Sequence, residues 1–317
     1  MSDYIIATSS TADLPRDYLD EHKIPFIRYS FTVNDLPRED DCREESRAAI
    51  YAGMRRGDLL KTSMISEYSY YNFFRGLLDS EKDVIFLDMS QKMSVSFENA
   101  RRAAESVQVE YPGRRLYVMD TRCISGGLGL LVKKMVERRE AGESFEQVIA
   151  WGEENKLKMA HRFTVDDLSY LKRGGRVSNA SALVGSLLNI KPVLYVPDAG
   201  TLDVVKKARG RKAALRAIID GVVHDLSRTD AAGTEFLILH ADCLTDAEFV
   251  RDEIRRAFPQ VGEMNISSLG VVIGAHCGPG LSRCSTSAAG ERRTEARQKN
   301  GKKGRKKDGN SEQHPIC

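Results

Sequence analysis

The sequence predicts an α/β protein of two domains: an N-terminal α/β/α domain built on a parallel sheet, and a smaller C-terminal α/β domain with a mixed sheet. Three observations lead to this prediction. Short apolar runs alternate with helical periodicity through the first half of the chain, as in parallel sheets covered by helices. The second half changes to a hairpin pattern and shorter mixed elements. The length of 317 residues also favours two domains.

The N-terminal domain is predicted at 1–162. Apolar runs bounded by polar residues indicate strands at 4–7, 24–33, 84–87 and 116–119. Helical patterns occupy the segments at 14–22, 43–56, 66–78, 94–109, 126–141 and 145–156. Ser66 is expected to cap the third of these helices, with Glu67 in its first turn.

The C-terminal domain is predicted at 163–280. Its helices are expected at 166–172, 180–188, 212–226 and 246–258, and its strands at 191–195, 201–205, 236–240 and 263–268. Gly174 and Gly175 are expected to end the first helix. The Pro-Asp-Ala-Gly sequence at 197–200 predicts a hairpin turn. Residues 274–280 indicate a tight Gly-rich turn that carries a single histidine.

The composition indicates a soluble globular protein. Hydrophobic residues make up 41% of the chain and charged residues 29%, which is ordinary for that class. No apolar run reaches the about 18–20 residues of a membrane span, and the N-terminus enters a strand directly, unlike a signal peptide. Six cysteines lie far apart, without the paired spacing of a zinc site. We therefore expect a cytoplasmic protein with reduced thiols and no bound metal.

From residue 281 the apolar pattern stops, and residues 281–317 form a basic tail with a composition typical of disorder. The tail holds ten Lys and Arg residues against four Asp and Glu, a net charge of +6. The whole chain carries +3, so the remaining 280 residues carry −3. One interpretation is an arm that binds nucleic acid or an acidic membrane surface. Another is a flexible tail without a role.

The genetic code offers a third interpretation of the tail. Residues 281–288, LSRCSTSA, can be encoded so that one added nucleotide ahead of codon 281 changes the reading to TVALFYFG. That reading is an alternating apolar strand followed by glycine, at the place where a strand is expected to close the second domain. We therefore hypothesise that a one-nucleotide deletion near codon 281 has frameshifted the segment 281–317.

Four clusters of hydroxyl residues occur in the N-terminal half, at 8–11, 62–66, 90–96 and 120–125, and three of them directly follow apolar strands. Ligands of open α/β sheets bind beyond the carboxyl ends of the strands. Hydroxyls and free helix N–H groups there suit a carboxylate or a phosphate, although simple helix capping is the alternative. No catalytic base lies in these loops, so the clusters indicate an anion-holding site rather than a nucleophilic enzyme.

Two glycine-containing segments carry further candidate residues. Arg173 and Arg176 flank the glycine pair at 174–175, where basic residues either accompany a helix end or face a phosphate or a partner. His276 lies in the Gly-rich segment 274–280, where a single histidine is either structural or catalytic. P-loop, dinucleotide-binding and nucleophile-elbow motifs are absent from the sequence.

Six segments resemble the DegV family of bacterial fatty-acid-binding proteins. They are TSSTADLP at 8–15, KTSMIS at 61–66, MSQKMSVSFENA at 89–100, MDTRCISGGLG at 119–129, DDLSYLKRGGRVSNASALVGSLLNIKPVLYV at 166–196 and GVVIGAHCGPG at 270–280. The fifth is the most specific, because it is long and nearly ungapped. The resemblance covers residues 4–280, and the family's strand after Gly-Pro-Gly is similar in type to TVALFYFG.

The resemblance implies a two-domain α/β protein that buries a long-chain fatty acid between its domains. Thr62, Ser94 and His276 match the family positions around the fatty-acid carboxylate, together with the backbone N–H of Val95. Val95 replaces the glycine of the family pattern, and a positive φ at this position would strain a valine. The resemblance therefore predicts the site but leaves the geometry around Val95 as its weakest part.

The resemblance also implies a partner. In the family, a separate kinase subunit receives the bound acid and converts it to acyl-phosphate with ATP. Arg173 or Arg176, and Arg209, fall where family members present arginines to that kinase. We therefore expect a non-enzymatic fatty-acid carrier without a cofactor and without a nucleic-acid partner, in a role that leaves room for transient contact with a membrane surface. The alternatives are a small-molecule phosphotransferase or hydrolase that uses His276, and a nucleic-acid-binding protein that uses the tail.

Overall fold

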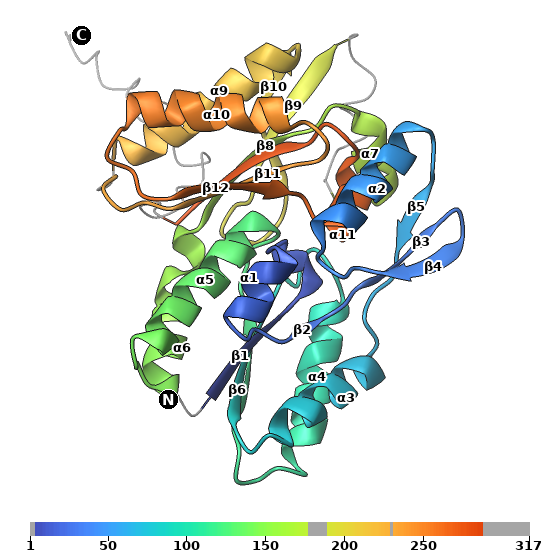
Figure 1. Cartoon of the computed structure of the whole chain (residues 1–317), viewed down its shortest axis with the longest axis vertical. Helices are drawn as coiled ribbons and strands as arrows, with labels where there is room; N and C mark the ends of the chain where they lie inside the picture. Colours follow the sequence, from blue (N-terminus) through green and yellow to red (C-terminus); the bar gives the residue numbers. More distant parts are fainter. Residues whose placement is uncertain (1–3, 177–188, 229–230, 288–317) are drawn as a thin grey trace, which may run out of the picture.

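The computed structural model describes residues 4–176, 189–228 and 231–287, which form three sheets and the helices around them. Figure 1 shows the N-terminal parallel sheet in the lower part of the molecule and a larger sheet above it. The predicted α/β class, with one parallel sheet and one mixed sheet, is confirmed. None of the helices in these ranges is long and apolar enough to cross a membrane.

The first sheet is parallel throughout, with the strand order β2-β1-β6-β7. Its strands are β1 (Tyr4–Ser9), β2 (Phe26–Ile27), β6 (Asp83–Asp88) and β7 (Leu116–Asp120). Its helices are α1 (Arg16–Glu21), α3 (Glu67–Leu78), α4 (Ser96–Gln108), α5 (Gly126–Glu140) and α6 (Phe145–Asn155). Figure 1 shows α5 and α6 on one side and α3 and α4 on the other. Burial on both faces explains why β1 and β6 are almost continuously apolar.

A small antiparallel sheet, in the order β4-β3-β5, belongs to the same domain. It consists of β3 (Ser30–Val33), β4 (Leu36–Glu39) and β5 (Leu60–Thr62), and α2 (Glu44–Arg55) connects β4 to β5. The single strand predicted at 24–33 is therefore wrong. The chain leaves the parallel sheet at Tyr29, whose N–H donates to Ser10 Oγ at 3.1 Å and whose carbonyl accepts from the Asp40 N–H at 3.0 Å.

The second sheet has six strands in the order β10-β9-β8-β13-β11-β12. They are β8 (Ala160–Thr164), β9 (Ile190–Tyr195), β10 (Asp203–Arg209), β11 (Phe236–His240), β12 (Met264–Ser268) and β13 (Ser282–Thr286). β11 and β12 pair in parallel, and the other neighbouring pairs are antiparallel. The hairpin predicted around 197–200 is present as β9 and β10. Helices α9 (Arg211–Leu226) and α10 (Leu244–Ala257) cover the outer face, and α5 packs on the inner face.

Two predictions near the end of the second domain are wrong. β13 lies in the segment assigned to a disordered tail, and it fills the position between β8 and β11. The segment 274–280 is not only a turn, because its first residues complete helix α11 (Val271–Cys277). The rest of the predicted tail, 288–317, and the helix predicted at 180–188 lie outside the described residues.

The two domains share one apolar core. Buried side chains run from the parallel sheet through α5 to the inner face of the six-stranded sheet, and a second core lies beneath α9 and α10. The predicted division between residues 162 and 163 falls inside β8, which belongs wholly to the second sheet. We propose that the division lies just before β8. The shared core fixes both walls of the space between the domains.

Candidate ligand-binding site

A cavity of about 400 Å³ lies between the two domains. Side chains of both domains line it, and its apolar lining includes Met89, Met93, Ile124, Phe163, Leu202 and Ile273. One end is open to solvent, where Met64 and Val95 are 61% and 63% exposed. The other end is buried, where Phe163 and Arg283 are each 1% exposed. The cavity therefore has an accessible mouth and a closed interior.

Thr62 and His276 meet in the lining of the cavity, although 214 residues separate them in the sequence. Thr62 ends β5, and His276 lies in the last turn of α11. Thr62 Oγ1 is 2.8 Å from His276 Nε2. Gly174, the last residue of α7 (Leu168–Gly174), allows this placement, because a Cβ there would lie 2.8 Å from His276 Nδ1. Gly174 thus serves close packing against the histidine, whereas Gly175 ends α7 at a φ of 64°.

His276 is a neutral imidazole at ordinary pH. Burial lowers its pKa to about 4, and the positive charge of Arg176 lowers it further, while a backbone hydrogen bond with Gly174 partly offsets both. A neutral ring offers one donor and one acceptor nitrogen. The ring can therefore share a hydrogen bond with Thr62 without bringing a second positive charge into the cavity.

Ser94 and Val95 form the start of α4 at the mouth of the cavity. Ser94 Oγ donates to Ser96 Oγ at 3.0 Å and accepts from the Ser96 N–H at 3.1 Å. Val95 has a φ of −69°, which any residue adopts readily. The strain that the valine would suffer at a positive φ is therefore absent. The N-terminus of α4 presents backbone N–H groups here, where an anion is favoured.

The three candidate arginines fall in different surroundings. Arg176 lines the cavity, with its Nη1 donating to the Gly174 carbonyl at 2.7 Å and its Nε to the Met93 carbonyl at 3.4 Å. Arg173 is exposed on α7, with its guanidinium carbon 4.4 Å from the centre of the Tyr170 ring. Arg209 is exposed at the end of β10. Only Arg176 of the three shares the cavity with His276.

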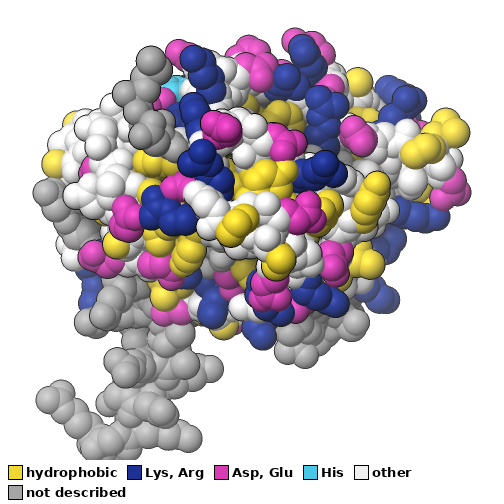
Figure 2. Space-filling view, turned by 90° about the horizontal axis from the view of Figure 1, so that it is seen from below, with side chains coloured by type: hydrophobic (Ala, Val, Ile, Leu, Met, Phe, Trp, Pro, Cys, Tyr) yellow, Lys and Arg dark blue, Asp and Glu magenta, His cyan; other side chains and the backbone are white. Residues whose placement is uncertain are grey.

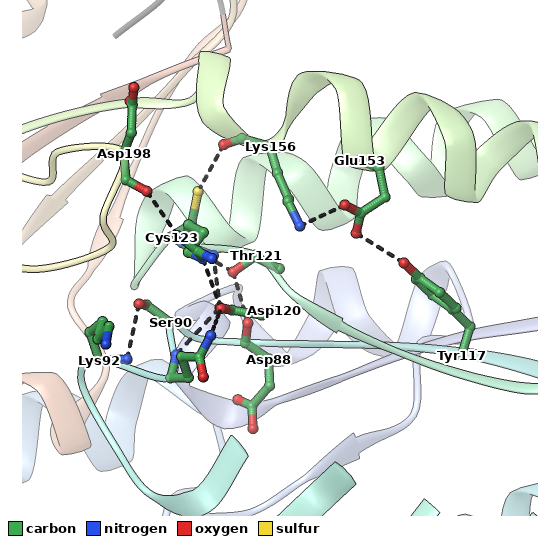
Figure 3. A network of polar contacts seen from close by, with 12 residues as sticks. Asp88, Ser90, Lys92, Tyr117, Asp120, Thr121, Cys123, Glu153, Lys156 and Asp198 are labelled. Atoms are coloured by element: carbon green, nitrogen blue, oxygen red, sulfur yellow. Dashed lines mark hydrogen bonds and ion pairs between the residues drawn. The ribbon is translucent and has the colours of Figure 1, made fainter. Parts of the chain in front are cut away.

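The other hydroxyl clusters have structural roles beneath the site. Ser9 Oγ and the Tyr70 hydroxyl each donate to the buried Asp88 carboxylate at 2.7 Å. Thr121 Oγ1 donates to the Asp88 carbonyl at 2.7 Å. Figure 3 shows Asp120, the last residue of β7, and Thr121, which follows it, beside Ser90 and Lys92, which follow β6. These contacts fix the loops that lead into the Ser94 segment.

The structure adds two buried polar cavity residues that lie outside the hydroxyl clusters and the other segments singled out in the sequence. Tyr29 and Arg283 both line the cavity, and both are buried. Tyr29 sits in a segment that alternates like a strand, which indicates only a core aromatic. Arg283 lies in the segment assigned to the tail. No local sequence signal identifies either residue as part of a site.

The site is suited to holding an anion at the end of an apolar chain. Hydroxyls, a neutral imidazole, the N-terminus of α4 and the Arg176 guanidinium surround the mouth. The interior is lined mainly by apolar side chains, with Arg283 at the closed end. Within the described ranges, no three His, Cys, Asp or Glu side chains are grouped as they would be to hold a metal ion.

Comparisons with known proteins match almost the whole described chain. The model of the uncharacterised DegV family matches residues 4–285. A DegV domain-containing protein of Clostridium perfringens is 34% identical over 281 residues, which cover 88% of this chain and 96% of that protein.

Solved structures have the same fold. A DegV lipid binding protein from Thermotoga maritima has a TM-score of 0.80 and 27% identity, with 92% of this chain and all of that chain covered. A DegV family protein from Thermus thermophilus, described by its fatty acid binding, has a TM-score of 0.81 and 29% identity over 90% and 99% of the two chains. DegV of Bacillus subtilis, described as a fatty acid binding protein, has a TM-score of 0.77 and 26% identity over the same shares.

Proposed function

The chain belongs to the DegV family, and on this premise we propose that it binds a long-chain fatty acid in the cavity between its domains. The observation that carries the proposal is the polarity of the cavity. Its mouth holds hydroxyls, an imidazole and a guanidinium, and its closed interior is mainly apolar. A fatty acid has the same order of groups, with a charged head and an apolar chain. The fatty-acid-binding relatives from Thermus thermophilus and Bacillus subtilis support this assignment.

The carboxylate is proposed to bind at Thr62, Ser94, the Val95 N–H and His276. His276 Nε2 lies 2.8 Å from Thr62 Oγ1 in the free protein, and a bound carboxylate would accept the Thr62 hydroxyl proton in its place. The N-terminus of α4 and the Arg176 guanidinium add positive potential at the same place. Several donors and one nearby cation would offset the loss of water around the charged head.

The acyl chain is proposed to extend inward between Met93 and Phe163. Each methylene removed from water stabilises the complex by about 0.8 kcal/mol. A chain of many methylenes therefore supplies most of the binding free energy, and the head group sets the orientation. Affinity should rise with chain length until the chain reaches the closed end of the cavity.

The protein is proposed to be a carrier that acts with a separate kinase subunit rather than an enzyme by itself. The kinase would phosphorylate the carboxylate at the exposed mouth and so form an acyl-phosphate. The exposed residues Arg173 and Arg209 are the candidate contacts for this partner. We place this role in the cytoplasm, where the thiols of the five cysteines in the described ranges would stay reduced.

The Thr62–His276 pair also favours a second candidate function. A hydroxyl 2.8 Å from an imidazole nitrogen is the arrangement of a nucleophile with its base. A small-molecule hydrolase or phosphotransferase would use it in that way. Such an enzyme would turn over substrate without a partner, whereas the carrier would not.

The proposal is tested by extracting the purified protein with organic solvent and identifying bound lipids by mass spectrometry. We expect a co-purifying acid of 14–18 carbons, roughly the range that several kcal/mol of methylene burial would retain. Ser94→Ala should weaken binding of a 16-carbon acid about tenfold or more, because a hydrogen bond to a charged group is lost. Ser106→Ala, on the exposed face of α4, is the matched control and should bind normally. If the purified protein holds no fatty acid and hydrolyses or phosphorylates small molecules without a partner, the carrier assignment is contradicted.

A further inference from the structure

Tyr29 lines the cavity and carries a buried hydroxyl that has no hydrogen-bond partner among the described residues. Its backbone is held in the turn between β2 and β3, and its side chain is 2% exposed and lines the cavity. Among the described residues, no group meets the Tyr29 hydroxyl in hydrogen-bond geometry. Buried hydroxyls in native proteins are rarely left in this state, because they lose their hydrogen bonds to water.

Two of the hydroxyls near Tyr29, those of Tyr70 and Ser94, already donate elsewhere. Burial raises the pKa of Tyr29 well above its usual value, the charge of Asp88 raises it further, and the nearby hydroxyls of Ser96, Tyr70 and Ser94 only partly offset the increase. Tyr70 donates its proton to Asp88 at 2.7 Å, and Ser94 donates to Ser96 at 3.0 Å. Tyr29 therefore keeps its proton at neutral pH, and no described group accepts that proton in hydrogen-bond geometry.

The position of this hydroxyl identifies the acceptor. Tyr29 lies close to Ser94 and lines the same cavity as Thr62 and His276, so it belongs to the head-group end. The strand that follows Tyr29, β3, pairs with β5, and Phe31 of β3 lies opposite Thr62 of β5. A hydrogen-bond donor in this place can bind an oxygen anion, whereas an apolar chain has no acceptor for it.

We propose that Tyr29 is a head-group specificity residue, whose phenol donates a hydrogen bond to the carboxylate of the bound acid. This inference rests on the proposed fatty-acid-binding function and adds a donor from the turn between β2 and β3. Tyr29 selects for ligands whose head group carries a charged oxygen acceptor. Neutral lipids of the same length, such as the corresponding alcohol, gain much less from the phenol because hydrogen bonds to charged groups are the stronger ones.

The test compares Tyr29→Phe with the unaltered protein by titration calorimetry, using a 16-carbon saturated fatty acid and the 16-carbon alcohol. The variant should bind the acid about tenfold or more weakly, since one charge-assisted hydrogen bond is lost. Its affinity for the alcohol should change less than about threefold, because neutral hydrogen bonds contribute less. Its melting temperature without ligand should not fall, because no hydrogen bond of the free protein is removed.

Tyr70→Phe is the matched control, since it removes the neighbouring phenol that donates to Asp88. It should lower the melting temperature but leave the preference for acid over alcohol intact. An unchanged affinity of Tyr29→Phe for the acid overturns the inference. An equal loss for acid and alcohol also overturns it, because that result marks a packing role. Failure of the unaltered protein to bind either ligand would instead count against the proposed function.

Discussion

Asp13 is a buried carboxylate beside the contact between the two domains. It is fully buried at a φ of 57°, Ser125 Oγ donates to its Oδ2 at 2.5 Å, and its Oδ1 has no hydrogen-bond partner among the described residues. Burial raises its pKa to about 7, and the charge of Arg47 only partly offsets this. Gly270 of the second domain allows the approach, because a Cβ there would lie 2.0 Å from Asp13 Oδ1.

This environment predicts a pH-dependent effect of Asp13→Asn. The carboxyl pKa is raised in the folded protein, so the folded state binds a proton that the unfolded state lacks between about pH 4 and 7. That contribution to stability is complete below pH 4 and is lost as the pH rises through 7. Asparagine does not titrate and accepts the positive φ. The free energy of unfolding of the variant, relative to that of the original protein, should therefore rise by about 2 kcal/mol between pH 5 and pH 8.

Thermal unfolding of both proteins at the two pH values measures this difference. A parallel variant is Asp40→Asn. It changes another buried carboxylate of the same domain, whose pKa is also raised by burial. Both variants should become relatively more stable with rising pH. If the difference in stability between Asp13→Asn and the original protein is the same at both pH values, the raised pKa of Asp13 is contradicted.

Sequence patterns identify some residues of the candidate site and not others. Thr62 and Ser94 stand in hydroxyl clusters at the ends of extended segments, and the family resemblance singles out His276. Tyr29 carries no such signal, because an unsatisfied phenol becomes visible only when its surroundings are known. Arg176 was assigned to a partner surface, yet the turn after α7 brings it into the cavity. Its position depends on long-range packing that no local pattern encodes.

At the scale of elements, strands with continuous apolar sequences were the most predictable. β6, β7 and β11 appear within one residue of their predicted bounds, because each contains an apolar run bounded by polar residues. The separation of β2 from β3 was not predictable, since it depends on contacts of Tyr29 with Ser10 and Asp40. β13 was missed for the opposite reason: its sequence is polar where its position is buried.

β13 is an unusual central strand. Its sequence Ser-Arg-Cys-Ser-Thr is buried at every position, between β8 and β11. Arg283 is held there by hydrogen bonds from its Nη2 to the Ile124 carbonyl at 2.8 Å and His161 Nδ1 at 2.6 Å, with its guanidinium over the Phe163 ring. Central strands normally carry β-branched and aromatic residues. The polar strand in this place agrees with the hypothesis of a frameshift near codon 281.

We predict that replacing residues 281–288 with TVALFYFG raises the free energy of unfolding. Exchanging buried polar side chains for apolar ones should stabilise the sheet by about 1–3 kcal/mol for each well-packed residue. The matched control has the same composition shifted by one position, which turns each side chain to the other face. Urea unfolding should rank the replacement above the original protein and the shifted control below the replacement. No gain over the original protein would speak against an apolar native strand.

At the scale of the whole molecule, α2 fastens the second domain to the first. Arg47 is buried, and its guanidinium donates to the Ser268 carbonyl at 2.8 Å and to the Leu14 carbonyl at 3.1 Å. Tyr51 donates to the Leu269 carbonyl at 3.0 Å. These contacts hold the segment that begins α11, and α11 carries His276. The part of the cavity that Thr62 and His276 line is therefore fixed by contacts between the domains.

The face shown in Figure 2 gives no support for a nucleic-acid role of the described residues. Figure 2 shows Lys and Arg side chains interspersed with Asp and Glu on the face that it presents, without a broad basic area among the described residues. Non-specific nucleic-acid binding relies on a basic stripe or patch. The basic charge of this chain is concentrated in 281–317, and its residues 288–317 lie outside the described ranges.

The final prediction separates fatty-acid binding from transfer to the kinase. Arg173 and Arg209 are exposed, and neither lines the cavity. Changing both to alanine should leave the affinity for a 16-carbon acid unchanged. It should raise the kinase KM for the loaded carrier about tenfold, because charges at the edge of an interface mainly control association. Acyl-phosphate formation by a cognate kinase subunit, measured at several salt concentrations, gives this KM.

Arg256→Ala is the surface control, since Arg256 has a side chain that is 71% exposed on α10. It should change neither binding nor transfer. Arg176→Ala should behave differently from both, because Arg176 lines the cavity beside His276, and its loss should weaken binding of the acid itself. Equal transfer by the double variant and the Arg256 control would place the kinase contact elsewhere. If Arg176 holds the ligand while Arg173 and Arg209 contact the kinase, the two kinds of variant should fail at different steps. Arg176→Ala should lose affinity for the acid, and the double variant should lose transfer to the kinase.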